Sequence, residues 1–216
     1  MTPPEAVLFD NDGLLLDTEA VWTRGEQRLF EARGKEFTLD HKRSLVGSSE
    51  KVAAAKLVRF LDEPGSEKTI MEELNELVLE ELEGGVDAMV GGRELLAELN
   101  RRGIPVALIS NSPMKFIRRS HEMAGTGLPF GAVVSGHEVP MAKPAPDAYL
   151  EGCRQLGVEP SKRSVALEDS PSGVAAGLAA GLFVIGVPSV PGIDLGVADL
   201  VVESLEDDAV VAKLLG

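Results

Sequence analysis

The stretch that decides the fold is residues 6–13, Ala-Val-Leu-Phe-Asp-Asn-Asp-Gly, in which four apolar residues run directly into a pair of aspartates. The apolar run is continuous instead of alternating, which is typical of a strand buried on both faces of a parallel sheet. Asp10 and Asp12 are two positions apart, so both side chains can project beyond the strand end, where the chain turns at Gly13. Two carboxylates this close cost free energy unless a cation or a proton separates them, although these residues also suit a plain turn.

Five more apolar runs follow along the chain, and each is nearly continuous: residues 106–109, 132–134, 165–167, 183–187 and 200–202. Helical periodicity appears between them, at residues 93–102, 114–123, 145–156 and 171–180. This alternation predicts an α/β fold with a doubly wound, Rossmann-like parallel sheet. Ligands of such sheets bind outside the carboxyl ends of the strands, so the residues that follow each strand are the candidates for function.

Residues 10–105 separate the first strand from the second, which is far more chain than one crossover needs. Most of this stretch has helical character, in segments at residues 19–32, 39–45, 50–61 and 66–83. We therefore predict that residues 18–86 form an α-helical domain inserted after the first strand. Residues 1–17 and 87–216 then form the α/β core.

Polar residues also follow the second, third and fourth strands. Residues 110–113, Ser-Asn-Ser-Pro, predict a helix that starts with Pro113 and is capped by Ser112, and its free N–H groups could bind a phosphate. Lys143 follows the third strand, and residues 168–173, Glu-Asp-Ser-Pro-Ser-Gly, follow the fourth. Each group alone also fits a capped helix, a surface lysine or a capping acid. Together, carboxylates, a lysine and a hydroxyl at one sheet edge match a magnesium site beside a phosphoryl pocket.

Composition excludes several classes of protein. With 44% hydrophobic residues in 216, the chain is not disordered and can bury a sizeable core. The 21 basic and 35 acidic residues leave a net charge of −14 without a basic run, which argues against nucleic acid and anionic membranes as partners. The single cysteine, Cys153, excludes an internal disulfide and is expected to be a buried apolar residue. No apolar stretch approaches the ~20 residues of a membrane span, so we expect a cytoplasmic protein.

Taken in order, these motifs resemble the haloacid dehalogenase-like hydrolase superfamily, in the branch that contains β-phosphoglucomutase and small sugar-phosphate phosphatases. The resemblance covers essentially the whole chain and rests on residues 10–19, 110–111, 143–144 and 168–173. It implies that residues 18–86 are the helical cap that closes over the active site. It also implies a Mg²⁺-dependent phosphoric monoester hydrolase acting on a small phosphorylated metabolite, above all a sugar phosphate. Such a cap-plus-core phosphatase is compatible with a monomer.

The resemblance also implies a role for each catalytic residue. Asp10 matches the nucleophile that takes up the phosphoryl group as an aspartyl-phosphate, and Asp12 matches the general acid/base. Lys143 would neutralise the developing charge and hold Asp10 in position. Ser110 would bind the phosphoryl oxygens, with the backbone of Asn111 beside it. These assignments agree with the physical need to bring a carboxylate and a phosphate dianion together, which requires positive charge between them.

The implied metal ligands are Asp10, the backbone carbonyl of Asp12, Asp169 and, directly or through water, Glu168. In the cap, residues 47–49 resemble a loop whose glycine lets the backbone approach the substrate. Gly47 and Ser48 are therefore candidate substrate-binding residues, and Glu138 is a candidate contact for the leaving group.

Two departures favour a phosphatase over the alternative, a phosphoryl-transferring mutase like β-phosphoglucomutase. Trp22 stands where the mutase branch carries a histidine, and residues 69–83 lack the lysine that the mutase uses. Trp22 could stack on a substrate or pack between cap helices. Asn11 replaces the apolar residue that is common between the two aspartates, which leaves both acids intact.

Other functions fit less well. Dehalogenation on the same fold needs no metal, which would leave Asp12, Glu168 and Asp169 without a role. A non-enzymatic phospho-receiver also pairs carboxylates with a lysine, but such a module is far shorter and has no helical insertion. His121 and His137 match no position of the family's site, so we expect both at the surface.

Overall fold

The molecule is built on one parallel sheet. The structure is a computed structural model that describes residues 3–216, so residues 1–2 of the predicted core lie outside the description. Within residues 3–216 the sheet has six parallel strands in the order β3-β2-β1-β4-β5-β6. The strands are β1 Ala6–Phe9, β2 Val106–Ser110, β3 Ala132–Ser135, β4 Ser164–Glu168, β5 Phe183–Gly186 and β6 Leu200–Val201. The predicted doubly wound α/β fold is confirmed.

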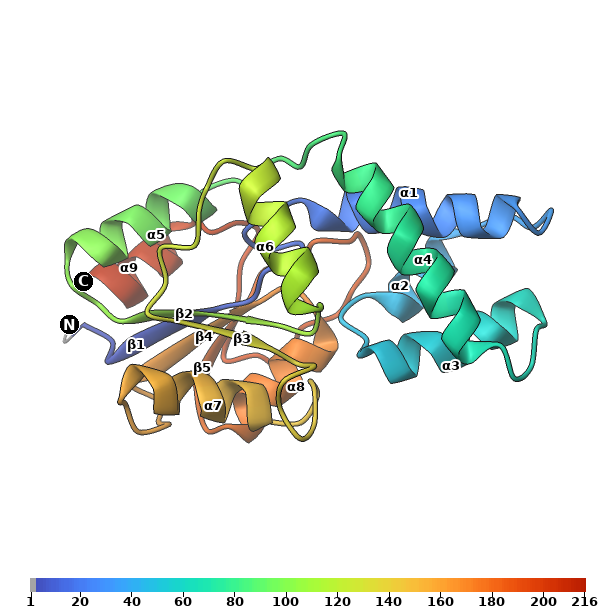
Figure 1. Ribbon diagram of the computed structural model, residues 1–216. Helices are drawn as coiled ribbons and strands as arrows, with labels where there is room; N and C mark the ends of the chain where they lie inside the picture. The colour runs from blue at the N-terminus through green and yellow to red at the C-terminus, as the bar shows by residue number, and fades with distance from the viewer. Residues whose placement is uncertain (1–2) are drawn as a thin grey trace.

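Helices cover both faces of this sheet (Figure 1). They are α5 Gly92–Arg101, α6 Met114–Met123, α7 Asp147–Leu156, α8 Pro171–Ala179 and α9 Asp208–Leu215. Helices α5, α6 and α9 lie on one face, and α7 and α8 on the other. Successive side chains of β1 alternate between the two layers, with Val7 and Phe9 in one and Ala6 and Leu8 in the other. Every residue of β1 is buried because this strand is central and has helices on both sides.

A separate helical region follows β1 and forms the cap (Figure 1). Its helices are α1 Thr18–Glu31, α2 Leu39–Leu45, α3 Glu50–Leu61 and α4 Glu67–Leu82. They pack around an apolar core of their own, in which Leu29, Leu57 and Leu74 are almost fully buried. The Asp17 carboxylate caps α1 by accepting a hydrogen bond from the backbone N–H of Ala20, at 3.3 Å.

Two adjacent segments connect the cap to the sheet. The backbone N–H of Asp17 donates to the carbonyl of Asp87 at 2.8 Å, and Leu16 forms an antiparallel bridge with Ala88. The chain therefore leaves the sheet and returns to it at one place, next to the predicted limits of the 18–86 insertion.

Two further observations bear on the expectations from composition. No helix within residues 3–216 combines the length and the apolar character needed to cross a bilayer. Cys153 in α7 is fully buried, and burial, with the nearby charge of Glu159, raises the pKa of its thiol to about 11. It is a core residue, as expected.

Candidate active site

A buried lysine holds two carboxylates together at the carboxyl edge of the sheet. Asp10 directly follows β1 and Glu168 ends β4, the strand that pairs with β1. Lys143 comes from the loop between β3 and α7, and its Nζ lies 2.5 Å from Asp10 Oδ1 and 2.6 Å from Glu168 Oε1. All three side chains are less than a tenth exposed. The topology has thus joined three of the predicted site residues that are far apart in the sequence.

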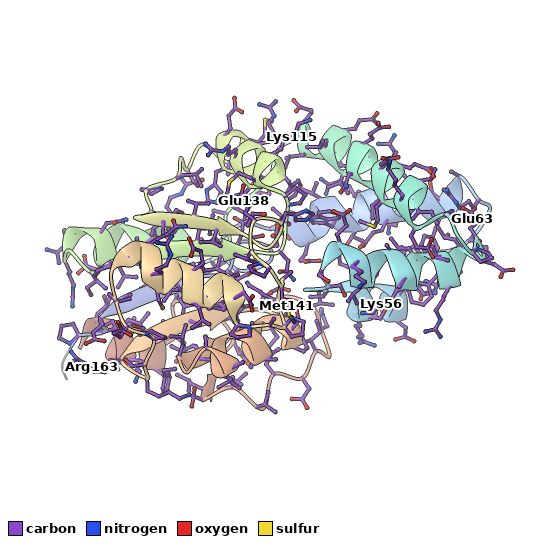
Figure 2. All side chains as sticks on the ribbon, turned by 60° about the horizontal axis from the view of Figure 1, so that its bottom comes forward. Lys56, Glu63, Lys115, Glu138, Met141 and Arg163 are labelled. Carbon is purple, nitrogen blue, oxygen red and sulfur yellow. The ribbon has the colours of Figure 1, made fainter. Side chains whose placement is uncertain are left out.

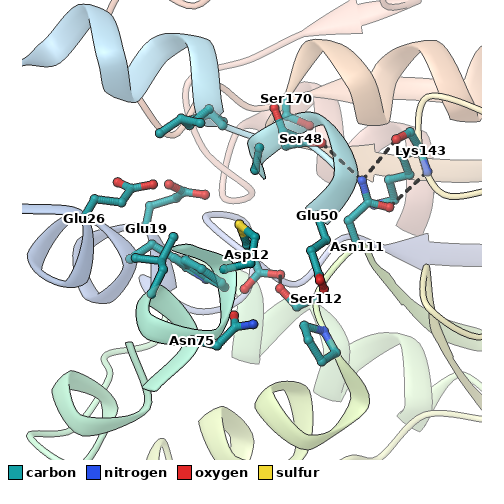
Figure 3. Close-up of a pocket in the computed structure, with 18 of the residues that line it drawn as sticks. Asp12, Glu19, Glu26, Ser48, Glu50, Asn75, Asn111, Ser112, Lys143 and Ser170 are labelled. Carbon is teal, nitrogen blue, oxygen red and sulfur yellow. Dashed lines mark hydrogen bonds between the residues drawn. The ribbon is translucent and has the colours of Figure 1, made fainter. Parts of the chain in front are cut away.

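Lys143 is held both at its Nζ and at its backbone. Its Nζ also donates to the carbonyl of Ile109 at 2.8 Å. Asn111 accepts from the backbone N–H of Lys143 at 3.0 Å and donates to its carbonyl at 3.2 Å, as the dashed lines in Figure 3 show. Burial by itself lowers the pKa of Lys143, but Asp10 and Glu168 more than offset this and raise the pKa above its usual value. The side chain is therefore a fixed ammonium.

The acidic side of the site carries more negative charge than Lys143 can balance. One oxygen from each of Asp10, Glu168 and Asp169 lies within 4.8 Å of the others. Burial, together with the neighbouring carboxylates, raises the pKa of both Asp10 and Asp169 well above the usual value. Glu168 Oε2 is buried without a hydrogen-bond partner, and a Cβ at Gly173 would come within 1.7 Å of it. A buried, unpartnered oxygen among three carboxylates fits a metal ion that prefers oxygen ligands.

Asp12 occupies a different environment at the same edge. Its carboxylate is half-buried and accepts hydrogen bonds from the hydroxyls of Thr18 at 2.7 Å, Ser110 at 2.7 Å and Ser112 at 2.9 Å. Ser110 was predicted to bind phosphoryl oxygens, and in this structure its hydroxyl donates to Asp12. The prediction that Ser112 caps a helix was wrong. Helix α6 spans Met114–Met123, as the periodicity predicts, but Pro113 has an extended ψ of 143° and takes the N-cap position itself instead of the first helical position.

The cap reaches the site through the loop after α2. Gly47 has a positive φ of 67°, and a Cβ there would lie 2.3 Å from the hydroxyl of Ser170, so only glycine fits without displacement. The carbonyl of Gly47 accepts from Asn111 Nδ2 at 3.2 Å and from the hydroxyl of Ser172. Ser48 lies next to it and accepts from Lys56 Nζ at 3.0 Å. The predicted loop therefore lies directly over the residues that follow β4.

A cavity of about 100 Å³ lies between the cap and the sheet edge. Asp10, Asp12 and Lys143 line it on the sheet side. Figure 3 labels Asp12 and Lys143 there. On the cap side Trp22 lines it and also packs against Phe116, with ring centroids 5.3 Å apart. Of the residues predicted for binding, Gly47, Ser48 and Asn111 also line this cavity, whereas Ser110 and Glu168 lie behind its wall.

A family model described as haloacid dehalogenase-like hydrolase matches residues 4–181 of the chain. This protein belongs to the haloacid dehalogenase-like hydrolases. The resemblance inferred from its motifs is confirmed, including the branch of sugar-phosphate phosphatases and β-phosphoglucomutase-like proteins.

Individual relatives of this haloacid dehalogenase-like hydrolase match over most of their length. Hexitol phosphatase A of Escherichia coli K12 is 34% identical, over 95% of this chain and 94% of that protein. Phosphorylated carbohydrates phosphatase of Thermotoga maritima is 32% identical, over 82% of each chain. The crystal structure of CbbY from Rhodobacter sphaeroides in complex with phosphate superposes with a TM-score of 0.83 at 27% identity, covering 99% of this chain and 100% of that one. This haloacid dehalogenase-like hydrolase is a phosphatase, a phosphoric monoester hydrolase.

The prediction that His121 lies at the surface was wrong. Its side chain is buried in α6, with Nε2 2.9 Å from Asn11 Oδ1 and Nδ1 2.8 Å from the hydroxyl of Thr126. Asn11 in turn donates to Asp12 Oδ1 at 3.1 Å. The helical spacing could have predicted the burial of His121, because His121 lies four residues after the buried Ile117 and so shares its helix face. In this hydrolase Asn11 is a buried link between His121 and Asp12.

Other expectations have mixed outcomes. His137 is exposed as predicted, although it also lines the cavity, 3.4 Å from the carboxylate of Glu50. Glu138 is exposed (Figure 2) and does not belong to the cavity wall.

One group of charged residues in the cavity was missed altogether. It consists of Glu19 and Glu26 on α1 and Lys42 on α2, all of which line the cavity. The seven-residue spacing of the two glutamates places them on one helix face, and that spacing was the available signal. Their pairing with Lys42 depends on how α1 and α2 pack together.

Proposed function

We propose that this phosphatase is Mg²⁺-dependent and hydrolyses a small sugar or sugar-alcohol monophosphate through an aspartyl-phosphate on Asp10. The observation that carries the proposal is that Lys143 and the surplus of buried carboxylates meet at Asp10, inside a cavity covered by the cap. The names of the two relatives, a hexitol phosphatase and a phosphorylated carbohydrates phosphatase, support the class of substrate.

In the first half-reaction the Asp10 carboxylate attacks the phosphorus in line with the ester bond. That bond breaks, and Asp12 gives its proton to the departing alcohol oxygen. In the second half-reaction a water molecule attacks the phosphorus of the aspartyl-phosphate while Asp12 takes a proton from the water. Inorganic phosphate leaves and the Asp10 carboxylate is restored. Lys143 keeps Asp10 aligned and places an ammonium beside the negative charge that gathers on the phosphoryl group.

The proposed metal ligands are Asp10, Asp169, the backbone carbonyl of Asp12 and, directly or through water, Glu168. Bound there, Mg²⁺ would supply the positive charge that lets a carboxylate and a phosphate dianion approach each other. Ser110 and the backbone of Asn111 are proposed to bind the phosphoryl oxygens, which requires the Ser110 hydroxyl to turn away from Asp12. Gly47 and Ser48 would contact the substrate from the cap, residues 18–86, which would move as one unit.

A phosphoryl-transferring mutase is the alternative, and the cavity offers less support for it. A mutase must hold a bisphosphate intermediate and therefore needs positive charge at both ends of its site. Among residues 3–216 the lysines that line this cavity are Lys42 and Lys143, and each already contacts two carboxylates. Trp22 and Asn75 line the cap side, where this chain lacks the mutase's histidine and lysine.

The test is release of inorganic phosphate from a panel of C2 to C6 phosphate monoesters, with and without Mg²⁺. We expect Mg²⁺-dependent release from sugar and sugar-alcohol phosphates, and none from the Asp10→Asn variant. Activity that survives Asp10→Asn would disprove the aspartyl-phosphate mechanism. Isomerisation without net phosphate release, after a lag that a bisphosphate removes, would show the mutase instead.

A further inference from the structure

A second lysine-centred cluster lies in the cavity, on its cap side. Lys42 Nζ lies 2.5 Å from Glu19 Oε2 and 3.2 Å from Glu26 Oε2. The side chains of Lys42 and Glu26 are only 7% and 6% exposed, and that of Glu19 is 13% exposed. Figure 3 shows the two glutamates side by side, at the end of the pocket away from Asn111 and Lys143.

Stability alone does not account for this cap cluster. Burying three charges costs desolvation free energy, and apolar side chains of similar volume often serve the packing of two helices as well or better. Burial raises the pKa of Glu26 to about 7 in spite of the attraction of Lys42, so ionisation of Glu26 lowers the free energy of unfolding. Glu19 Oε2 is buried and lies 2.5 Å from Lys42 Nζ, so this oxygen is paired with the ammonium. Both glutamates contact Lys42 through Oε2, which leaves the second carboxylate oxygen of each, Oε1, to accept a hydrogen bond from a ligand.

The position of the cap cluster indicates which part of a substrate it meets. A phosphoryl group attacked by Asp10 lies at the sheet edge, so the rest of the molecule extends toward the cap. There it meets the carboxylates of Glu19 and Glu26 and an ammonium whose charge they already balance. Hydroxyl groups can donate to the carboxylates and accept from the ammonium, whereas a second anion would find repulsion and no free cation.

We propose that Glu19, Glu26 and Lys42 bind the leaving group of the substrate, and that they select an uncharged polyhydroxyl chain and exclude a second anionic group. The inference rests on the proposed phosphatase function and adds a rule for its substrate. The enzyme prefers the monophosphate of a sugar or sugar alcohol to a bisphosphate or a phosphorylated sugar acid of the same length.

A matched pair of substrates tests the rule. D-glucitol 6-phosphate and 6-phospho-D-gluconate are open six-carbon chains that differ at C1, which is an alcohol in one and a carboxylate in the other. For the wild-type enzyme we expect kcat/KM to be at least about tenfold higher with the alcohol. Equal values, or a preference for the acid, would overturn the proposal. A tenfold preference for glucosamine 6-phosphate over glucose 6-phosphate would also overturn it, because the site would then select an ammonium group.

At pH 8, above the pKa of about 7 that burial gives Glu26, the variant Glu26→Gln removes one negative charge and keeps the shape of the side chain. We expect it to reduce the preference for the alcohol at least about threefold, through a lower KM for the acid. Glu80→Gln is the matched control, since Glu80 is 64% exposed on α4, pairs with Arg28 and changes the net charge equally. It should leave the preference unchanged. If Glu26→Gln folds poorly by circular dichroism, Glu19→Gln replaces it, with the same expected direction.

p-Nitrophenyl phosphate separates failure of this inference from failure of the proposed function. Its leaving group has no hydroxyl chain, so its hydrolysis by the wild type reports on the phosphoryl site and not on the alcohol-to-acid preference. If it is hydrolysed while Glu26→Gln leaves the alcohol-to-acid preference unchanged, the inference is wrong and the phosphatase function stands. If the wild type with Mg²⁺ hydrolyses neither this compound nor any ester of the panel, both are wrong.

Discussion

Two clusters, each with a buried lysine between two carboxylates, lie on the core side and the cap side of the cavity. In the core, Lys143 contacts Asp10 and Glu168 at 2.5 and 2.6 Å, and in the cap, Lys42 contacts Glu19 and Glu26 at 2.5 and 3.2 Å. The core cluster has one more carboxylate, from Asp169, and the unpartnered Oε2 of Glu168. The core cluster therefore has charge left over for a cation and a nucleophile, whereas the cap cluster is closer to balance. The same residue types serve chemistry in one place and recognition in the other.

The difference in role between the two clusters is tested most directly by neutralising one carboxylate in each. Asp10→Asn removes the nucleophile, so we expect kcat to fall at least about 10³-fold. Glu26→Gln should leave kcat for a neutral sugar phosphate within about threefold of the wild type. Steady-state kinetics with Mg²⁺ measures both values. Similar losses of kcat in the two variants would contradict the division between chemistry and recognition.

The two lysines provide the next test. Lys143→Met removes the ammonium that holds Asp10, and we expect kcat to fall about 10²- to 10³-fold. Lys42→Met removes a hydrogen-bond donor for the leaving group, so KM should rise about tenfold while kcat changes less than about threefold. Circular dichroism establishes that each variant is folded. A rise in KM alone for Lys143→Met, together with a large fall in kcat for Lys42→Met, would show that the two lysines have the opposite roles.

The cap cluster should also make stability depend on pH. Burial raises the pKa of Glu26 from 4.5 to about 7, so the folded protein keeps the proton over a range in which the unfolded chain has lost it. Protonation of Glu26 stabilises the folded state fully below pH 4.5, and this contribution is lost as the pH rises through 7. The loss of unfolding free energy from this group is about 3 kcal/mol at most. Urea unfolding at pH 5 and pH 8 should show a smaller loss of unfolding free energy in Glu26→Gln than in the wild type. An equal loss in both proteins would show that Glu26 ionises normally.

The smallest effect is expected at the contact between the two regions. Gly47→Ala would place a methyl group 2.3 Å from the Ser170 hydroxyl, at a φ of 67°, so we expect the cap loop to shift and KM to rise about tenfold. Gly65→Ala is the matched control, because Gly65 also has a positive φ, of 86°, but has open space around it. Both variants should lose similar stability in thermal melts. Equal kinetics in the two would show that Gly47 matters for backbone strain alone.

The strand ends were predictable from the sequence because backbone geometry leaves little freedom there. Continuous apolar runs predict buried parallel strands, and parallel strands bring their carboxyl ends to one edge. Asp10, Lys143, Glu168 and Asp169 therefore meet as their positions in the sequence suggest. The C-terminal helix α9 was not predicted, and α7 begins at Asp147, two residues later than the predicted 145.

The errors arose where side chains find partners outside their own segment. Ser112 is adjacent to a proline that suits a helix start, but its hydroxyl donates to Asp12, which is a hundred positions away. His121 follows Arg118, Arg119 and Ser120, a polar context that suggests a surface position, yet it is buried against Asn11. Polar residues are buried when a hydrogen-bond partner is in reach, and that partner is visible only in the folded chain.

The sequence by itself determined the class of fold, the family and the residues that meet at the end of β1. It could do so because strand periodicity and parallel pairing bring the side chains that follow the strands to one edge of the sheet, independently of the rest of the chain. Only the tertiary structure decided that Lys42 from α2 lies between Glu19 and Glu26 of α1, and that these three face the phosphoryl site. The packing of two helices depends on many weak apolar contacts at once, such as those of Leu29 and Leu57 in the cap core. No short stretch of sequence carries that information.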